Sequence, residues 1–466
     1  MIYSSFEFFV FFGLLLAALA ALGSENARRN LLLVASYVFY GWWDYRFCFM
    51  LLGITVVDYF VSLRMELAPD RDHRRRWLLV SLCMNLGLLA FFKYTNFLVG
   101  NLRGPLAAFG VALPAHLNVI LPVGISFITF QTMSYSIDVY RGRLSPPRRF
   151  RDFALFAAFF PQLVAGPIVR GIFFLPQLAT IHPIRLENLR VGAEIFLRGF
   201  VKKVLFADRL SIFADAVFAN PALYSSPTCW LAALAYTGQI YFDFSGYTDM
   251  AIGVGRCLGF QLPENFRHPY ISTNLSEFWQ RWHISLSTWL RDYLYIPLGG
   301  NRRGTARTYV NLMITMLLGG LWHGASWTFV AWGALHGLGL VVHRLFGRES
   351  DEPRPWGARR LASWAGTFLF VVVCWVFFRA KDFPAAWAML RKMAWIDPTG
   401  VHWFYVHALV ILAIAAVLHV GTVLRKERPW VLPLDRPTGL ALACALLLVV
   451  LFFAPVGTNP FIYFQF

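Results

Sequence analysis

The chain has 466 residues, of which 58% are hydrophobic and only 14% are charged, and its mean hydropathy is +0.55. This composition predicts an integral membrane protein and excludes a soluble two-domain enzyme of the same length. The net charge of +17 is spread over short loops, so it is expected to set the membrane topology. No basic domain exists that would hold a duplex, which excludes a nucleic-acid-binding protein.

Apolar passes alternate with basic loops in the first part of the chain. The loop 64–76 carries five arginines and a second basic cluster follows at 141–151, whereas 99–117 has a single arginine. Because Lys and Arg accumulate in cytoplasmic loops, we predict an external N-terminus and an uncleaved first span. The passes predicted here are 6–22, 31–43, 47–63, 77–98 and 118–140.

The segment 153–176 is apolar but irregular. Pro161, Gly166 and Pro167 interrupt it. Proline breaks a helix and frees carbonyl groups, which hydrocarbon does not tolerate. We therefore predict a re-entrant element that is buried in protein or lines a water-filled cavity.

The rest of the chain supplies a polar helical region at 186–219 and further passes. The pass at 229–255 contains Asp243 and Asp249, which are expected to face a cavity or an arginine. Residues 1–466 are predicted to form one helical domain of about ten to twelve spans, with the side of the C-terminus left open. The last predicted passes are 361–378, 403–424 and 438–454.

Two histidines lie where hydrocarbon is expected. His283 is flanked by Trp282, Leu286, Trp289 and Tyr293, which recur at helical spacing as one apolar face. An ionisable side chain at membrane depth is a candidate functional residue, and imidazole titrates near neutral pH, as proton transfer requires.

His323 is the second of these histidines, and it follows the apolar run 313–321. Gly319, Gly320 and Gly324 surround it and allow a substrate or another backbone to approach. Trp322 and Trp327 are expected to wall its pocket.

Other interpretations of these residues stay open. In the alternative interpretation of His323, it is a buried structural histidine that is hydrogen-bonded to a backbone carbonyl. In the alternative interpretation of His283, it is a structural histidine that is paired with Asp292 or with a backbone carbonyl. Arg281 and Arg291 either pair with Asp292, Asp243 or Asp249, or one of them grips the phosphate of a nucleotide thioester.

His336 and His343 lie seven residues apart on one helix face. No carboxylate has ligand spacing and no HExxH is present, so no metal site is predicted. Neither a serine-hydrolase elbow nor a Walker or dinucleotide glycine pattern occurs.

The motifs around the two histidines resemble the membrane-bound O-acyltransferase family, in the bacterial branch typified by the membrane subunit of alginate O-acetylation. The matching residues are 278–302 and 321–327, with further fits at 120–127, 135–140, 164–168 and 459–466. The resemblance implies an all-α polytopic membrane protein: a helical shell around a thin centre, with re-entrant helices and a through-passage.

The resemblance also implies chemistry. His323 would be catalytic with His283 as its companion, inside a catalytic core at about 260–345. No cofactor is expected; acetyl-CoA or an acyl carrier would arrive as substrate from the cytoplasm, in the inner membrane of a bacterium. The acceptor would be an exported polysaccharide such as alginate or a periplasmic acetyltransferase. We expect substrate contacts from Arg281, Trp282, Trp289, Arg291, Trp322, Trp327 and Asp243.

The residues alone leave two other functions open. A secondary transporter or flippase also contains broken helices and buried charges. An inert scaffold for a polysaccharide-export complex is the third interpretation.

Overall fold

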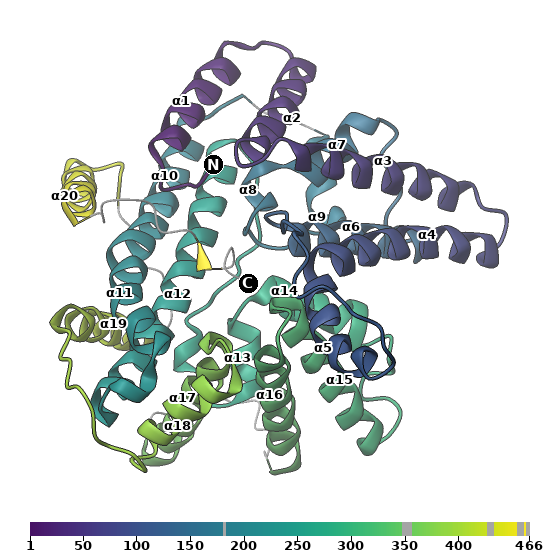
Figure 1. Cartoon of the computed structure of the whole chain (residues 1–466). Coiled ribbons are helices and arrows are strands. Elements are labelled where there is room, and N and C mark those ends of the chain that lie inside the picture. Colours follow the sequence, from purple (N-terminus) through teal and green to yellow (C-terminus); the bar gives the residue numbers. More distant parts are fainter. Residues whose placement is uncertain (180–182, 347–356, 426–432, 454–460, 463–466) are drawn as a thin grey trace. The chain divides into compact units, whose positions relative to one another are not determined.

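The computed structural model describes residues 1–179, 183–346, 357–425, 433–453 and 461–462, which consist of helices and the loops between them (Figure 1). The chain divides into two compact units. Unit 1 comprises Met1–Phe196 and Ala251–Pro263, and unit 2 comprises Leu197–Met250 and Glu264–Phe466.

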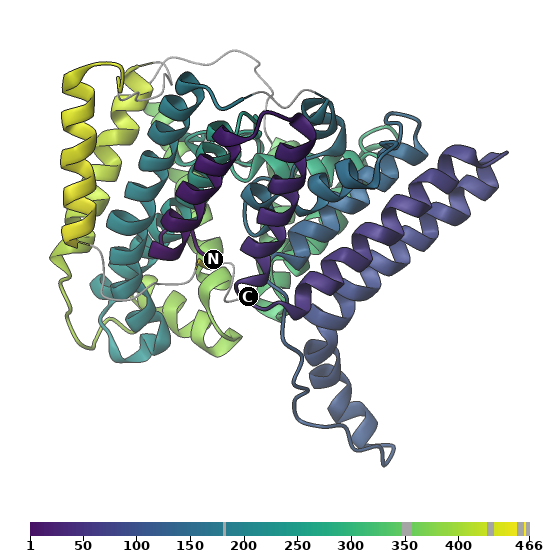
Figure 2. The same cartoon turned by 90° about the horizontal axis from the view of Figure 1, so that it is seen from above.

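Unit 1 is built mainly from the helices of Met1–Phe196, together with the end of the helix Ser226–Cys257. Helices α3 and α4 run side by side, as Figure 2 shows, and α6 packs against both. The elements are α1 (Phe6–Ala21), α2 (Glu25–Gly41), α3 (Arg46–Leu67), α4 (Arg71–Leu89), the π-helix η1 (Ala90–Tyr94), α5 (Thr95–Ala107), α6 (Ile125–Tyr140), α7 (Phe150–Ala158), α8 (Phe160–Leu163), α9 (Gly171–Phe174), η2 (Leu175–Leu178) and the first part of α10 (Leu186–Val201).

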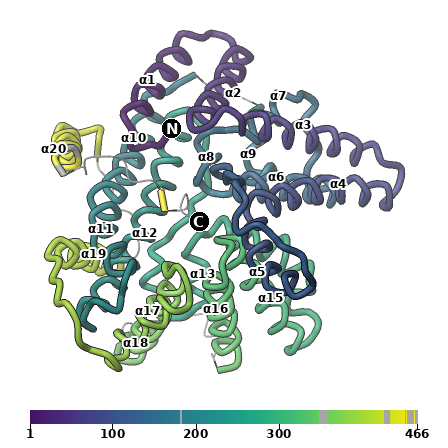
Figure 3. Tube along the Cα trace, in the orientation of Figure 1, coloured from purple at the N-terminus to yellow at the C-terminus, as the bar shows by residue number. Residues whose placement is uncertain are grey.

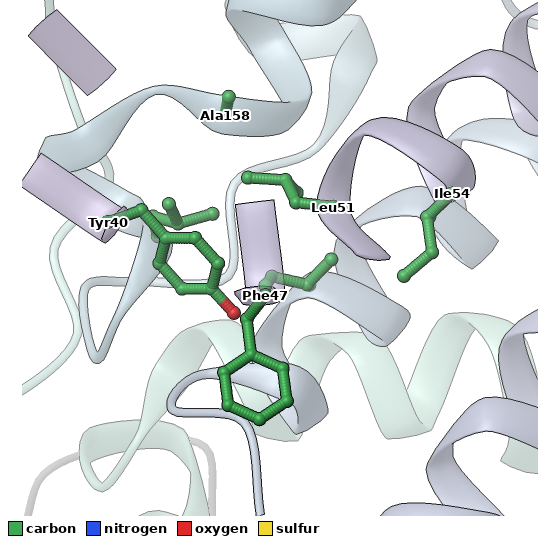
Figure 4. Close-up of a cluster of buried hydrophobic side chains, with 7 residues drawn as sticks. Tyr40, Phe47, Leu51, Ile54 and Ala158 are labelled. Atoms are coloured by element: carbon green, nitrogen blue, oxygen red, sulfur yellow. The ribbon is translucent and has the colours of Figure 1, made fainter. Parts of the chain in front are cut away.

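A hydrophobic cluster joins these helices (Figure 4). Tyr40 of α2 packs with Phe47, Leu51 and Ile54 of α3 and with Ala158 at the end of α7. Each of these side chains is at most 8% exposed. Burial of such apolar area is the main stabilising term for a helical unit.

The predicted break in 153–176 is confirmed. Helix α7 ends before Phe159, and α8 restarts with Pro161 in its first turn. The carbonyl of Phe156, freed by the break, accepts hydrogen bonds from the side-chain amides of Gln131 and Gln162, each at 2.7 Å. Residues 153–165 are all buried, so the irregular backbone is satisfied inside protein, as proline in an apolar segment requires.

Unit 2 contains the region with the two histidines. Its elements are the end of α10, the π-helix η3 (Lys202–Ala207), α11 (Asp208–Ala219), η4 (Pro221–Leu223), most of α12 (Ser226–Cys257), η5 (Pro269–Ile271), α13 (Leu275–Arg281), α14 (Ile284–Leu290), the π-helix η6 (Arg291–Tyr295), α15 (Thr305–His323), α16 (Trp327–Phe346), α17 (Ala358–Arg379), α18 (Phe383–Met393), α19 (Val406–Leu424) and α20 (Pro437–Phe453).

Helices α15 and α16 form a closely packed pair, whose adjacent course Figure 3 traces. A Cβ on Gly320 would lie 2.3 Å from the carbonyl oxygen of Phe329, and one on Gly333 would lie 2.4 Å from that of Met316. Only glycine allows two helix backbones to approach so closely. The sequence left open whether the glycines near His323 admit a substrate or another backbone. Gly320 admits another backbone, that of α16.

Five helices among the described residues are long and apolar enough to cross a membrane: Arg46–Leu67, Arg71–Ala107, Trp327–Phe346, Ala358–Arg379 and Val406–Leu424. Phe6–Ala21 and Pro437–Val450 are shorter apolar helices. Among the described residues the count is below the predicted ten to twelve for two reasons. Helices such as α6, with 16 residues, are shorter than a spanning helix needs, whereas α12 and α15, with 32 and 19 residues, are long enough but not apolar enough. The chain is an all-α polytopic membrane protein.

Candidate active site

His283 lies at a sharp turn between two short helices. Asn274 caps α13 by accepting the backbone N–H of Glu277 at 2.8 Å, and α13 ends at Arg281. His283 then adopts a left-handed conformation, with φ 43° and ψ 56°, and α14 begins at the next residue. The prediction of one continuous helical face from Trp282 to Tyr293 is therefore wrong, because a left-handed residue interrupts the helix.

Asn265 holds this turn in place. Its backbone carbonyl accepts the N–H of Ile284 at 2.9 Å. Its side-chain Oδ1 accepts the backbone N–H of Ser285 at 3.1 Å and the Ser285 hydroxyl at 2.9 Å, and it lies 3.1 Å from Nδ1 of His283. Three contacts on one oxygen stabilise a backbone conformation that a non-glycine residue rarely adopts.

The same contacts fix the tautomer of His283. A backbone N–H only donates, so the Asn265 atom that it meets is the acceptor oxygen and not the amide nitrogen. Nδ1 of His283 faces this oxygen and therefore carries the proton. The neutral ring then has its basic lone pair on Nε2.

His283 is fully buried, and it lies outside the five candidate spans. Burial lowers the pKa of its imidazole to about 3, so the ring is neutral near pH 7. Asp292, one of the partners expected from the sequence, forms an ion pair with Arg291 instead, at 2.7 Å. The hydrogen-bond partner of His283 Nδ1 is a side-chain amide.

His323 is the last residue of α15 and is 2% exposed. The chain leaves the helix at Gly324, where a Cβ would lie 2.1 Å from the ring of Phe329. Glycine there lets that ring lie against the end of α15. The imidazole is thus placed at a helix terminus, packed against α16.

The two imidazoles come together inside unit 2. The ring centroids of His283 and His323 are 6.4 Å apart. Trp322 contacts both rings, at 5.9 Å and 5.0 Å, and His323 also meets Trp332 at 5.0 Å and Phe378 at 5.2 Å. An unprotonated imidazole such as that of His323 can accept a proton and return it, with the second imidazole close by.

The expected tryptophans occupy different positions. Trp282 is fully buried against Trp375, at 4.9 Å between centroids. Trp289 is buried in α14 beside Tyr293. Trp327, in contrast, is 54% exposed at the start of α16. Of the two tryptophans expected to wall the pocket, Trp322 contacts His323, and Trp332, five residues after Trp327, takes the place of the other.

The two expected arginines have carboxylate partners. Arg281 pairs with Glu277 at 3.0 Å, an i,i+4 pair within α13. Arg291 pairs with Asp292, and its side chain is 59% exposed. The sequence left open whether these arginines pair with aspartates or bind a phosphate. Arg291 pairs with Asp292, as one interpretation expected, whereas Arg281 pairs with a glutamate of its own helix.

Asp243 belongs to a buried charge cluster in unit 2. Nζ of Lys203 lies 2.6 Å from Asp243 and 2.7 Å from Asp208, and all three side chains are at most 7% exposed. The second oxygen of Asp243 accepts the backbone N–H of Ile462 at 2.7 Å. Asp249 pairs with Lys202 at 2.7 Å. Neither aspartate is paired with the arginines expected from the sequence.

Three residues of this region were missed from the sequence. Asn265 stands in the loop Pro263-Glu264-Asn265, where the proline and the asparagine signal only a turn. Lys203 lies in the segment 186–219, for which the sequence predicted only a polar helical region. Trp332 is one of 17 tryptophans, and nothing in its local pattern distinguishes it.

Comparisons with known proteins identify the family of the chain. Residues 144–381, which include both histidines, match the model of the membrane-bound O-acyltransferase family. The chain is 47% identical over 396 residues to a probable alginate O-acetylase of Pseudomonas putida, covering 84% of this chain and 80% of the relative. It is 39% identical over 395 residues to a peptidoglycan O-acetyltransferase of Helicobacter pylori, covering 78% and 73%. The chain belongs to the membrane-bound O-acyltransferase family and is an O-acyltransferase.

Proposed function

We propose that this enzyme transfers an acetyl group from a thioester donor to hydroxyl groups of an exported polysaccharide, with His323 as the general base and His283 as its companion. The observation that carries the proposal is the pair of buried imidazoles 6.4 Å apart. A lone buried histidine is common as a structural residue, whereas two that lie together in one aromatic enclosure favour a functional role.

The reaction needs one base, and overall no proton is taken up or released. Unprotonated His323 takes the proton of the acceptor hydroxyl as its oxygen attacks the thioester carbonyl carbon. The new C–O bond forms, the C–S bond breaks, and the imidazolium returns the proton to the departing thiolate. The products are the ester and the free thiol. In the covalent variant the acetyl group resides briefly on His323 before the hydroxyl attacks.

His283 has the properties of a positioning partner. Its Nδ1–H is committed to Asn265, so its Nε2 presents a fixed acceptor to a hydroxyl group. We propose that Nε2 holds the acceptor hydroxyl beside His323. Orientation of this kind supplies a large share of the rate in bimolecular transfers.

The names of the relatives support an acetyl group and a polysaccharide acceptor. Both named relatives are acetyl-transferring enzymes, one for alginate and one for peptidoglycan. We propose acetyl-CoA or an acyl carrier on the cytoplasmic side, because such thioesters are made there. We propose that the protein lies in a bacterial inner membrane and that the acceptor reaches it from the periplasmic side. The acceptor is either the polysaccharide itself or a partner acetyltransferase.

Proteoliposomes test the sidedness and the chemistry together. Purified protein is reconstituted, labelled acetyl-CoA is added to one face, and hydroxyl-bearing oligosaccharide is enclosed on the other. The proposal predicts labelled ester on the oligosaccharide that depends on both substrates. Label that crosses the bilayer without an ester product would indicate a transporter and overturn it.

A further inference from the structure

A third histidine, His336, lies next to the pair but has no part in the proposed reaction. It is in α16 and fully buried. Its ring is 4.7 Å from that of Trp332, which in turn is 5.0 Å from His323. Trp332 thus contacts both imidazoles, and whatever orients Trp332 also affects His323.

His336 lies among aromatic rings. Trp279 is 5.2 Å away with its plane at 78°, and Phe370 is 5.9 Å away at 89°. Phe278 stacks on it at 6.0 Å, with an interplanar angle of 14°. An apolar side chain of the same size would pack there without polar atoms, so simple packing does not explain an imidazole.

The polar atoms of His336 need a partner that the residues described by the structure do not provide. Both ring nitrogens of His336 are buried and have no hydrogen-bond partner within the described part of the chain, and the same is true of the indole Nε1 of Trp279 and of Trp332. A neutral imidazole has one N–H and one lone pair, while an indole only donates. The imidazole N–H can point at a neighbouring ring face, but the lone pair requires a donor.

A water molecule meets these requirements. It accepts from an indole N–H and donates to the imidazole lone pair, which links two groups that are not hydrogen-bonded to each other in the structure. Buried polar groups in folded proteins are almost always satisfied by protein or by ordered water.

We propose that His336 is a positioning residue of the acyl-transfer site: it binds an ordered water molecule together with the indole N–H of Trp332 or Trp279, and this water fixes Trp332 and, through it, the ring of His323. The proposed role rests on the proposed function, whereas the water site itself does not. No proton of the reaction passes through His336.

The kinetic test compares His336→Phe with His336→Gln. Phenylalanine keeps the ring and removes both nitrogens, so kcat is expected to fall about 10- to 100-fold with KM within about twofold. Glutamine restores an acceptor and a donor, so its kcat is expected within about fivefold of the wild type. The matched control is His343→Phe, the same change on the same helix at a half-exposed position, with wild-type kinetics expected.

Wild-type kcat in His336→Phe overturns the proposal, and so does a His336→Gln enzyme as slow as His336→Phe. If His336→Phe does not fold, the glutamine variant decides alone: kcat within about fivefold supports the proposal, and a larger loss rejects it.

A density map that resolves bound water separates this proposal from the proposed function. We expect a peak within hydrogen-bond distance of a His336 ring nitrogen and of at least one of the two indole nitrogens, and no such peak in His336→Phe. A wild-type map without it rejects the water site even in an active enzyme. A map with it, in a protein that transfers no acyl group, rejects the proposed function and leaves the site in place.

Discussion

Replacing Asn265 by alanine tests how the turn at His283 is held. The change removes the single oxygen that accepts from Nδ1 of His283, from the backbone N–H of Ser285 and from the Ser285 hydroxyl. All of these groups are buried. Each buried donor left without an acceptor costs about 1 to 3 kcal/mol, so we expect the free energy of unfolding to fall by at least about 3 kcal/mol.

The loss of Asn265 also means that the proton of His283 is no longer fixed on Nδ1. Without the fixed acceptor at Nδ1, the proton is free to move to Nε2, and Nε2 then loses the lone pair that we propose holds the acceptor hydroxyl. We expect kcat/KM for acetyl transfer to fall about 100-fold or more. Thermal unfolding in detergent and acetyl-transfer kinetics in proteoliposomes measure the two effects on the same preparation.

Asn274→Ala is the matched control. Asn274 also accepts a backbone N–H, from Glu277 at the start of α13, but this is a helix cap worth about 1 kcal/mol and does not touch His283. The Asn274 variant should therefore lose little stability and keep most of its activity. Equal stability and equal activity in the two variants would refute the role assigned to Asn265.

Two further substitutions test the packing of unit 2. Gly320→Ala places a Cβ 2.3 Å from the carbonyl oxygen of Phe329, which forces α15 and α16 apart. The yield of folded protein and its activity should therefore fall sharply. The control is Gly366→Ala in α17, where the new Cβ meets nothing within 4 Å, so this change should be neutral. Normal expression and activity of the Gly320 variant would contradict the close approach. Lys203→Met leaves two buried aspartates without their cation and should destabilise the protein by about 3 to 5 kcal/mol, measured by thermal unfolding. Lys202→Met is the control, because it removes the more exposed ion pair with Asp249. A similar loss of stability in this variant would contradict the claim that burial makes Lys203 important.

The sequence predicted those features that depend on local pattern. Apolar length and basic loops indicated a polytopic helical protein, and the prolines at 161 and 167 predicted the broken segment after α7. The two histidines were selected because a titratable residue at membrane depth is costly. Each of these signals lies within a few consecutive residues.

Features that depend on the meeting of distant segments could not be predicted. The partner of His283 is 18 residues away in a loop, and the cation beside Asp243 is on a separate helix, 40 residues earlier. The left-handed turn at His283 has no glycine to announce it. Helical periodicity continued through Trp282 in the sequence, whereas the hydrogen bonds from Asn265 favour a break.

The rate of acetyl transfer by His323→Ala in proteoliposomes tests the central claim most directly, with folding and insertion checked on the same sample. If His323 is the base, the rate of ester formation should fall about 1,000-fold or more, while the protein elutes as the wild type does. Transfer at the wild-type rate would contradict the assignment of the reaction to this imidazole.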